Sequence, residues 1–495
     1  MPQSSEHRRR KACIIGAGPN GLAAAIVLAQ AGLDVEVFEA EPTLGGAART
    51  MELTLPGFHH DFGSAVHPLA VGSPFFSSLP LADYGLEWIH SPAPLAHPLD
   101  DGTAVLLERD LDVAEAGLGG GRGSESPDGK AWRSLMEPLA THWTSLAPDL
   151  LRPAIAFPKH PFLLARFGLN ALRSATAVAR HNLRTEPARA LFAGLAAHSF
   201  LALDQPLSAS FALVLGAAAH AVGWPIPRGG AQFLSNALAA HLAHLGGRVT
   251  TSTRITSLGD LPASDLILCD IPPRQLLALA GDSSASRLTA AYRSQLAAYK
   301  YGPAAFKVDY ALSRPIPWNA LPCLRSATVH IGGSLAEIAA SESAMASGRH
   351  AEKPFVILAQ PTLFDPTRAP EGKHIAWAYC HVPNGASESE SEATLHRLEA
   401  QIERFATGFG STVLARHVSP PAALEALDAN LIGGDIGGGA INLRQFLFRP
   451  TRRTYRASAP GIYLCSSSTP PGGGVHGMCG ANAARLALRD LERNH

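Results

Sequence analysis

The sequence has few cysteines, few aromatic residues and no excess of either charge. Its six cysteines are scattered without C-x-x-C spacing. This is typical of reduced, buried thiols in a cytoplasmic protein, so we expect no metal site and no redox-active cysteine pair. Lys and Arg together number 41, as do Asp and Glu. The balance argues against nucleic acid as a partner, because nucleic-acid binding needs a strongly basic surface.

Long apolar runs are also missing. The most apolar window, residues 207–226, is interrupted by Gly216, His220 and Gly223 and contains Pro225 near its end. We therefore expect a buried helix there and no membrane span. At 495 residues and 46% hydrophobic content, the chain is long enough for two or three domains with large cores.

A glycine-rich turn is the first motif that carries chemistry. A short strand (residues 13–15) leads into the turn, an Ala-rich helix (22–30) follows it, and a second strand (35–38) ends at Glu39. In a dinucleotide-binding turn the first glycine bends the chain, the second admits a diphosphate and the third lets the helix pack closely. A glycine turn without a ligand is the common alternative, but here the strand, helix and carboxylate stand in the required order. The turn is Gly16-Ala17-Gly18-Pro19-Asn20-Gly21.

The acidic residue narrows the choice of dinucleotide. Glu39 stands where a carboxylate accepts hydrogen bonds from ribose hydroxyls, and it would repel a 2′-phosphate. The turn therefore predicts FAD or NAD rather than NADP.

The basic residues at positions 7–11 and the apolar residues after them imitate an export signal. However, the apolar part is the dinucleotide turn itself, and cleavage would destroy it. We therefore expect the protein to stay in the cytoplasm.

A second glycine segment follows the acidic residue. Gly45-Gly46-Ala47-Ala48-Arg49-Thr50 is followed by a stretch from Asp61 to His67. With these segments the chain resembles the phytoene-desaturase, carotenoid-isomerase and amine-oxidase flavoproteins, although many relatives have arginine where this chain has Ala47. The resemblance implies that Gly45, Gly46 and Arg49 contact the FAD diphosphate. It also implies that Gly63, Ser64, Ala65 and Val66 run beside the isoalloxazine ring.

Further segments resemble the same flavoproteins. A helix over 233–245 leads to residues 248–255, which resemble the strand that contacts adenine, with Ile255 at the matching position. Near the C-terminus a strand over 461–465 precedes Ser466 and Ser467, where relatives carry a glycine and an acidic residue. A glycine-rich run then opens the last helix toward the flavin pyrimidine. The resemblance implies noncovalent FAD, although Cys479 leaves covalent attachment open. The cofactor-contacting residues in that run are Gly474, Val475, Gly477 and Met478.

These motifs predict an α/β fold in which a Rossmann-type FAD-binding domain is discontinuous in sequence. Residues 10–110, 224–290 and 455–495 would form that domain. The inserted substrate domain would consist of helices over 111–223, as a lid, and a mixed sheet over 291–454. We expect strands over 304–312, 354–360 and 374–382, and a flexible loop over 118–130. A glycine-rich run over 433–439 lacks a following helix, so we expect a loop over the active site and no second nucleotide site for NADPH.

Three residues are candidates for catalysis. Lys307 lies on a predicted strand that resembles the amine-oxidase strand whose lysine holds a water near flavin N5. On an alternating strand it shares a face with Asp309; an ordinary surface ion pair is the alternative. His67 and His476 fall in the flavin-flanking motifs and can act as acid or base near neutral pH, or simply as hydrogen-bonded structural residues. Tyr379 and His381 are weaker candidates for a substrate pocket.

A basic pattern marks the helical insertion. The basic residues recur every seven positions, and no Asp or Glu lies between Leu150 and Thr185. The spacing predicts one basic helix face, with apolar residues on the other faces. Residues 152–184 would then contact an anionic membrane or be a solvated lid surface. The basic residues are Arg152, Lys159, Arg166, Arg173 and Arg180, with Arg184 after them.

The resemblance implies an FAD-dependent oxidoreductase of the phytoene-dehydrogenase-like kind. It would desaturate, saturate or isomerise a C–C bond of an apolar substrate such as a polyene or lipid. The sequence does not name the electron acceptor, and oxygen and a quinone are both open. Amine oxidation is one alternative, but with 7% aromatic residues no aromatic cage is recognisable. A flavin-containing, membrane-associated binding factor without catalysis is the other alternative.

Overall fold

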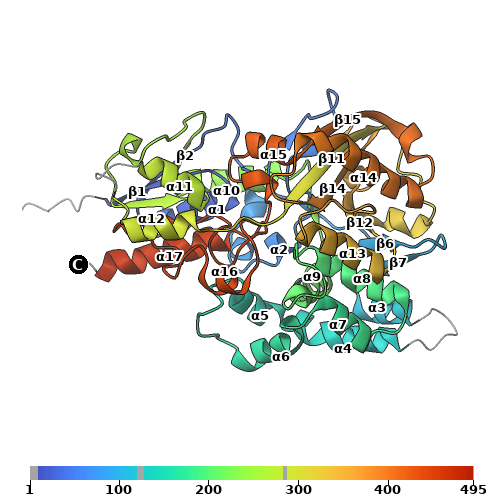
Figure 1. Ribbon diagram of the computed structural model, residues 1–495. Coiled ribbons are helices and arrows are strands. Elements are labelled where there is room, and N and C mark those ends of the chain that lie inside the picture. The colour runs from blue at the N-terminus through green and yellow to red at the C-terminus, as the bar shows by residue number, and fades with distance from the viewer. Residues whose placement is uncertain (1–8, 120–126, 282–286, 494–495) are drawn as a thin grey trace, which may run out of the picture.

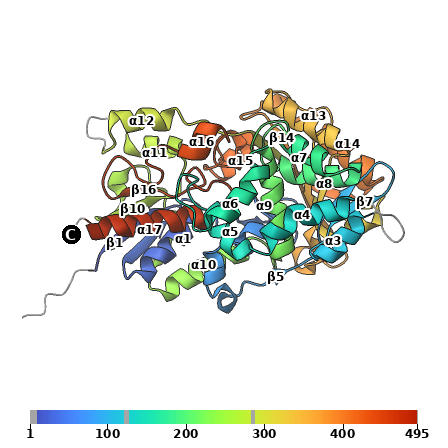
Figure 2. The same ribbon diagram turned by 90° about the horizontal axis from the view of Figure 1, so that it is seen from below.

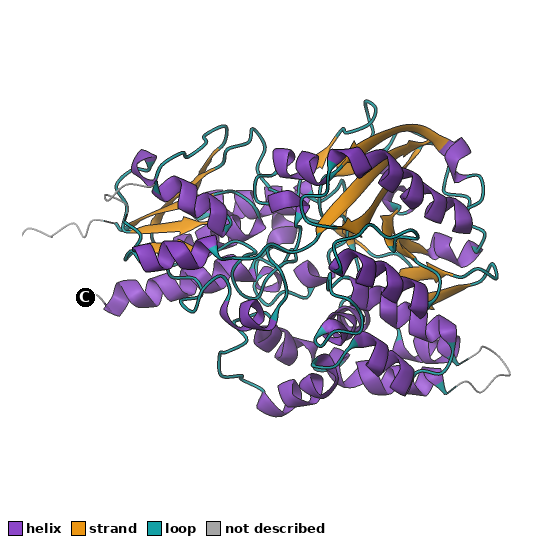
Figure 3. Ribbon diagram, viewed as in Figure 1, coloured by secondary structure: helices purple, strands orange, loops and turns teal. Residues whose placement is uncertain are grey.

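The structure is a computed structural model that describes residues 9–119, 127–281 and 287–493. It has the predicted α/β fold, with a parallel sheet in one part of the molecule and a larger mixed sheet in the other (Figures 1 and 3). Most of the loop expected over 118–130 lies outside the described residues.

The parallel sheet has five strands in the order β16-β10-β1-β2-β9. Its strands come from three separate parts of the chain, so this domain is discontinuous, as predicted. Most of the β1 and β10 side chains are buried, as expected for a parallel sheet covered on both faces. The strands are β1 (Lys11–Ile15), β2 (Asp34–Phe38), β9 (Arg248–Thr250), β10 (Leu266–Cys269) and β16 (Ile462–Leu464).

Helices cover both faces of this sheet. On one face α1 (Pro19–Gln30) packs between α10 (Gln232–His244) and α17 (Met478–Arg493). The other face carries α11 (Pro273–Ala280) and α12 (Ala290–Ala297). The first and last regular helices of the chain therefore lie side by side, as Figures 1 and 2 show.

The mixed sheet has seven strands in the order β15-β11-β14-β13-β12-β6-β7. Its neighbours are antiparallel except for β12 and β6, which are parallel. The strands predicted over 304–312 and 374–382 have the bounds of β11 and β14. The strands are β6 (Ala93–Pro98), β7 (Ala104–Leu107), β11 (Ala304–Leu312), β12 (Ser326–Ile331), β13 (Val356–Ala359), β14 (His374–Val382) and β15 (Val413–Ser419).

One predicted domain boundary differs from the structure. Residues 10–110 were expected to belong wholly to the FAD-binding domain, but β6 and β7 are part of the seven-stranded sheet. Every residue of β6 is buried, so its backbone N–H and C=O groups need hydrogen-bond partners inside the protein. Strand β12 of the mixed sheet supplies such partners. Two short ladders join neighbouring loops, β3 (Thr50–Met51) with β4 (His60–Asp61) and β5 (Trp88–Ile89) with β8 (Ile226–Pro227).

Helices sandwich the mixed sheet. One sheet face and the helical insertion share the largest apolar core, and α14 (Ser391–Phe405) covers the opposite face. No described helix has both the length and the apolarity to cross a bilayer. The insertion contains α3 (Leu111–Leu118), α4 (Asp128–Ala140), α5 (Trp143–Leu150), α6 (Pro161–Ala171), α7 (Ala175–Asn182), α8 (Glu186–Ala197) and α9 (Ser208–Ala221). The remaining helices of four or more α-helical residues are α2 (Pro68–Val71), α13 (Leu335–Ala346), α15 (Pro421–Leu427) and α16 (Leu443–Phe448).

The basic heptads do not lie on one helix. The chain leaves α6 at Ala171, and Ser174 caps the start of α7 by accepting a hydrogen bond from the N–H of Ala177. Arg173 lies in this break, so the expected single basic face is wrong. An N-cap serine satisfies the free N–H groups of a new helix, which is why the periodic sequence breaks here.

A substitution at Gly480 can test how closely α17 packs against α1. A Cβ added at Gly480 would lie 1.8 Å from the carbonyl oxygen of Asn20 in α1. We expect Gly480→Ala to lower the free energy of unfolding by about 1–3 kcal/mol, as overpacking does. Gly117→Ala is the matched control, because a Cβ at Gly117 meets nothing within 4 Å and alanine favours a helix. Urea unfolding of both variants is the measurement, and equal stabilities would contradict the packing account.

Candidate cofactor and active site

The N-terminal glycine turn lies between β1 and α1 and depends on its glycines. Gly16 has φ of 95°, a conformation that other residues rarely adopt. A Cβ on Gly21 would lie 2.0 Å from the carbonyl oxygen of Gly16. Gly18 caps α1 without a side-chain hydrogen bond, and Pro19 begins the helix. The first turn of α1 thus presents N–H groups and a positive dipole end that suit a diphosphate.

Glu39 lies at the end of β2, against the same turn. Its carboxylate accepts hydrogen bonds from the N–H of Ala17 at 2.8 Å and of Glu41 at 2.9 Å. The side chain is buried, and each carboxylate oxygen keeps lone pairs for a ribose hydroxyl. The predicted ribose-binding residue is therefore positioned by the turn itself.

The double-glycine segment packs on the first turn. The N–H of Gly45 donates to the carbonyl of Ala17 at 2.9 Å, and a Cβ on Gly46 would lie 3.4 Å from the Cα of Gly18. Arg49 is buried; its guanidinium donates to the carbonyls of Gly46 and Leu427 and lies over the Phe62 ring. Arg49 therefore holds the backbone of the double-glycine segment in place. Its contact with the FAD diphosphate stays a prediction.

The segment from Gly63 to Val66 joins this region to the C-terminal motif. The N–H of Ser64 donates to the carbonyl of Ala47 at 3.1 Å, and a Cβ on Gly63 would lie 2.5 Å from the same oxygen. Farther along, the hydroxyl of Ser73 donates to the carbonyl of His476 at 2.7 Å. The two halves of the predicted cofactor signature, far apart in sequence, are thus adjacent in the fold.

The C-terminal motif ends where α17 begins, at Met478. Gly474 and Gly477 have φ of 113° and 66°, and a Cβ on Gly477 would lie 2.4 Å from the Phe76 ring. The ring Nδ1 of His476 accepts a hydrogen bond from the N–H of Met478 at 3.1 Å. Val475 is half-buried between these glycines. The thiol of Cys479 donates to the carbonyls of Thr469 and Gly472, and burial raises its pKa to about 12, which suits a noncovalent cofactor.

The serines that replace the usual glycine and acid have structural partners. Ser466 donates to the carbonyl of Ile271 at 2.9 Å. Ser467 packs against Gly438, where a Cβ would lie 2.3 Å from its hydroxyl oxygen. Gly438 belongs to the glycine-rich run over 433–439, and a Cβ on Gly473 would meet the carbonyl of Gly437 at 2.8 Å. This run is a loop, as expected, and it covers the C-terminal motif.

Ile255 does not lie on a strand. β9 ends at Thr250, and residues 253–256 form no ladder with the sheet. The strand is interrupted at Ser252, which has φ of 52°, although Thr253 still donates its N–H to the carbonyl of Glu39 at 2.8 Å. The Ile255 side chain packs against the apolar cluster on one face of the parallel sheet. The expected strand reaching Ile255 is therefore corrected, and its contact with adenine stays a prediction.

Asp270 is a site residue that sequence reasoning missed. Its Oδ2 accepts the N–H of Gly21 at 2.8 Å, and a Cβ on Gly18 would lie 2.9 Å from the same atom. Burial first, then the charges of Asp428 and Glu39, raises the pKa of Asp270 to about 8. The side chain is therefore mostly neutral at pH 7. The signal available in sequence was its position directly after β10, at the carboxyl edge of the sheet where ligands bind.

The residues present fit a noncovalent dinucleotide. The turn supplies N–H groups and close backbone approach, Glu39 supplies a ribose acceptor, and a neutral Asp270 avoids repulsion with a diphosphate. The buried Oδ1 of Asn20 and Nε2 of His476 have no partner within the described residues. Such orphaned groups are uncommon in folded proteins unless a ligand or water meets them.

Lys307 and Asp309 form a buried ion pair on β11, so the surface-pair alternative is wrong. The Lys307 ammonium donates to Oδ2 of Asp309 and lies 5.7 Å from the centre of the Trp377 ring. The two side chains are 3% and 0% exposed. Burial lowers the pKa of Lys307 and, despite that lysine, raises the pKa of Asp309 to about 6.

A second buried ion pair adjoins the first. Oδ2 of Asp61 lies 2.8 Å from Arg368, and the side chains are 1% and 0% exposed. The His60 ring lies 3.6 Å from the Asp309 carboxylate. Burial, with the positive charges of Lys307 and Arg368, lowers the pKa of His60 to about 2, so this ring is neutral. Asp61 stands two residues before Gly63 in the sequence, and its charge acts on Lys307. Lys307 therefore lies near the segment that is predicted to run beside the flavin ring. No sequence pattern indicated His60 or Arg368.

The candidate histidines are both neutral at pH 7. Burial lowers the pKa of His67 and of His476 to about 4. Neither ring nitrogen of His67 has a described partner, and the ring stacks at 5.9 Å from Trp88. Each neutral ring can accept a proton or a hydrogen bond. Near neutral pH neither ring is the charged imidazolium that would act as a general acid. The predicted catalytic role of each stays a prediction.

The weaker pocket candidates lie on the same sheet face as Lys307. Tyr379 pairs with Lys307 across β14 and β11, and His381 pairs with Ala305. His381 is held at 2.7 Å by the buried carboxylate of Glu342. All six cysteines are free and buried, and no cluster of metal-ligating residues exists in the described chain.

Comparison with known proteins agrees with this architecture. Residues 14–76 match the family of NAD(P)-binding Rossmann-like domains. The chain is 28% identical to "Pyridine nucleotide-disulfide oxidoreductase domain-containing protein 2" of Rattus norvegicus, covering 97% of this chain and 94% of the relative.

Solved structures share the whole architecture. An oxidoreductase from Methanosarcina mazei superposes with a TM-score of 0.61 at 16% identity, covering 97% of this chain and 100% of that one. The chain therefore has the fold of that structure, with a parallel Rossmann-like sheet and a separate mixed sheet. Cyclohexylamine oxidase from Brevibacterium oxydans superposes with a TM-score of 0.57 at 16% identity, covering 98% and 100%. These matches support a general oxidoreductase with a flavin or nucleotide cofactor.

The neutral state of His67 predicts a pH effect on stability. Its pKa is about 4 in the folded chain and about 6.5 unfolded, so the unfolded state alone binds a proton between these values. Stability from this group is complete above pH 6.5 and is lost as pH falls toward 4. From pH 7.5 to 4.5, wild type should lose about 2 kcal/mol more than His67→Phe in urea unfolding. An exposed control, His181→Asn, should follow wild type; parallel curves for wild type and His67→Phe would contradict the buried neutral ring.

Proposed function

We propose that the protein is an oxidoreductase with noncovalent FAD, of the phytoene-desaturase-like kind, that desaturates, saturates or isomerises a C–C bond of an apolar substrate. The observation that carries the proposal is the buried Lys307–Asp309 pair, which neighbours Asp61, two residues before the Gly63 segment. FAD supplies hydride exchange at its N5 atom when it is bound.

The side chains around Lys307 hold its ammonium group in place and can take up or release one proton. Asp309 and Trp377 hold the Lys307 ammonium in one place, away from water. Because burial lowers the pKa of Lys307 and raises that of Asp309, the proton between them moves at small energetic cost compared with a solvated pair. The pair can therefore store or release one proton as a neighbouring group changes charge. His60 and Arg368 surround it and exclude solvent.

The surroundings of the pair support an apolar substrate. The sheet face that carries Lys307 also carries Ala305, Ile357 and Tyr379, which pack against α8 and α9 in the largest apolar core. Besides the ion pairs and His381, this face carries His330, whose ring is hydrogen-bonded to His198 at 3.0 Å. The apolar side chains around them offer dispersion contacts. A substrate bound here would be recognised by apolar area.

Amine oxidation is the second candidate, and the structure adds one observation in its favour. Trp377 and Tyr379 form an edge-to-face pair, 5.1 Å between ring centres, beside Lys307. Aromatic faces can orient a basic substrate. This pair was not recognisable from the aromatic content of the sequence.

Anaerobic mixing separates the two candidates. Purified protein is mixed without oxygen with a polyene, a monounsaturated lipid or a primary amine, and the flavin absorbance is followed. The proposal predicts bleaching when an apolar C–C substrate is desaturated, and product isomerisation without net bleaching when it is isomerised. Saturation requires flavin that dithionite has reduced beforehand, and the flavin absorbance then returns when the substrate is added. Bleaching by the amine alone would reject it in favour of amine oxidation, and ligand binding without any product would favour a non-catalytic binding factor.

Lys307→Met tests the ion pair. We expect flavin to remain bound and its reduction by substrate to slow by about 10²–10⁴-fold, the usual contribution of a positioned acid or base. Met also leaves the Asp309 charge unpaired and lowers stability, by about 3–5 kcal/mol. The matched variant Lys307→Met/Asp309→Asn removes that charge. It should recover stability in urea unfolding but not the reduction rate; unchanged reduction in stopped-flow would remove Lys307 from the mechanism.

Asp270→Asn tests the neutral carboxyl at the glycine turn. As pH rises through about 8, wild type places a negative charge beside Gly18. Two negative charges repel each other more strongly at the lower effective dielectric of a buried site than in water, so FAD release should accelerate by roughly ten-fold or more between pH 7 and 9.5.

The Asn variant is neutral throughout and should release FAD at a rate that changes little with pH. Asp204→Asn, an exposed position, is the matched control and should behave as wild type. Release is followed by the rise of flavin fluorescence on dilution. A wild-type rate that does not change with pH would contradict the proposed place of the diphosphate.

A further inference from the structure

Exposed apolar side chains gather in one part of the helical insertion. Phe157 is 86% exposed, Phe162 is 91% exposed and Leu169 is 75% exposed, and Ile155 and Leu172 are also exposed. Large apolar residues that are exposed singly are normal on a protein surface, whereas several within one short segment indicate a binding surface. We call residues 155–172 the α6 surface.

The helix α6 has two distinct faces. Phe162, Arg166 and Leu169 are spaced by four and three residues and share the outer face. Phe167 and Ala171 lie on the inner face and pack into the large core. The sequence placed the apolar residues away from the basic ones, but in the structure Phe162 and Leu169 flank Arg166.

The surface is basic and lacks compensating carboxylates. No Asp or Glu occurs between Leu150 and Thr185. The nearest acid, Asp149, is buried and accepts the N–H groups of Lys159 and His160 at 2.8 Å. Among the described residues, no salt bridge holds Lys159, Arg166 or Arg180. The α6 surface thus combines a net positive charge with protruding aromatic rings.

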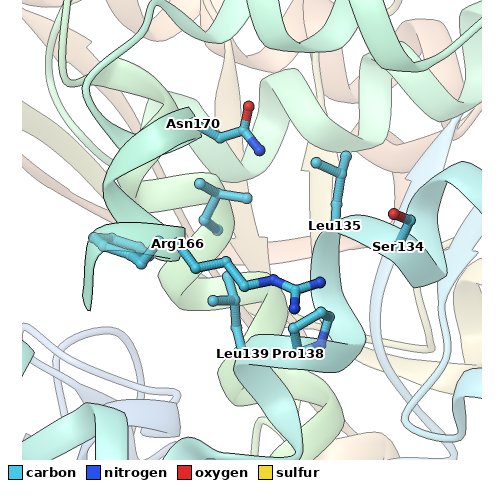
Figure 4. Close-up of a pocket in the computed structure, with 8 residues that line it drawn as sticks. Ser134, Leu135, Pro138, Leu139, Arg166 and Asn170 are labelled. Atoms are coloured by element: carbon cyan, nitrogen blue, oxygen red, sulfur yellow. The ribbon is translucent and has the colours of Figure 1, made fainter. Parts of the chain in front are cut away.

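The position of α6 leaves this surface open. The helix lies at the bottom of the molecule in Figure 1, on the side that Figure 2 views face on. Behind it a hollow of about 40 Å³ separates α6 from α4 and α9, and the Arg166 side chain lies across this hollow (Figure 4).

We propose that the α6 surface docks the protein on an anionic lipid bilayer. Phe157, Phe162 and Leu169 would enter the boundary between headgroups and acyl chains. Lys159 would contact anionic headgroups, and so would Arg166 once its side chain turns out of the hollow. Neither signal alone gives stable binding, but an apolar insertion together with a basic patch does. The proposal does not rest on the flavin chemistry, and a protein that binds membranes without turnover would leave it standing.

Vesicle flotation of the full chain tests the proposal. Wild type is mixed with vesicles of phosphatidylcholine alone or with about one third phosphatidylglycerol, at low and at high salt. We expect flotation with anionic vesicles at low salt and a loss at high salt, because salt screens the headgroup attraction. Absence of flotation with anionic vesicles at low salt overturns the proposal.

Two matched pairs of variants separate the apolar from the basic contribution. Phe162→Ser/Leu169→Ser should lower anionic-vesicle binding by at least ten-fold, whereas Leu321→Ser/Leu443→Ser, at exposed apolar positions elsewhere, should leave it unchanged. Lys159→Gln/Arg166→Gln should lower it roughly thirty-fold, at about 1 kcal/mol for each charge, whereas Arg314→Gln/Lys373→Gln should not.

All four variants change exposed side chains, and thermal melts check that each remains folded. Sedimentation without lipid asks whether the α6 surface instead joins two copies of the chain. A dimer that Phe162→Ser/Leu169→Ser dissociates, without any change in vesicle binding, overturns the proposal, as does equal binding by the α6 and control variants.

Discussion

The approach of α17 to α1 is the contact on which the candidate site depends. It brings the last helix against the first through Gly480, which has no side chain to separate α17 from the backbone at Asn20. The start of α17 then lies beside the start of α1, so the positive ends of two helix dipoles belong to one region. The double-glycine segment and the Gly63 segment are held against the same region by backbone hydrogen bonds. A site made from both ends of the chain requires this close packing.

The second constraint is the burial of charge around β11 of the mixed sheet. Lys307, Asp309, Asp61 and Arg368 are almost fully shielded from water. Burying paired charges rarely stabilises a protein relative to apolar side chains of the same shape. Shielding moves the pKa values of Lys307 and Asp309 toward each other, which suits the proton transfer proposed for this pair. The nearby histidines are kept neutral by the same burial.

Local signals determined much of the fold. Strand, glycine turn and helix around Gly16 follow from apolar runs and glycine positions, and β11 and β14 from mainly apolar segments, which Lys307 and Asp309 interrupt only in β11 and histidines only in β14. Long-range pairing was less predictable: β6 joins the distant β12, and nothing near residues 93–98 indicates that partner. The break between α6 and α7 depends on one serine cap that periodicity does not show. At the site, the glycines and Glu39 carry sequence signatures, whereas Asp270, His60 and Arg368 are brought in by tertiary packing.

The central claim is that the glycine turn, Glu39 and the start of α17 together hold noncovalent FAD. The most direct measurement is to denature the purified protein with acid and to identify the released cofactor by mass spectrometry and absorbance. The account predicts FAD, close to one per chain, in the supernatant and no flavin attached to the precipitated protein. Release of NAD without flavin, or flavin that stays with the polypeptide, would contradict it.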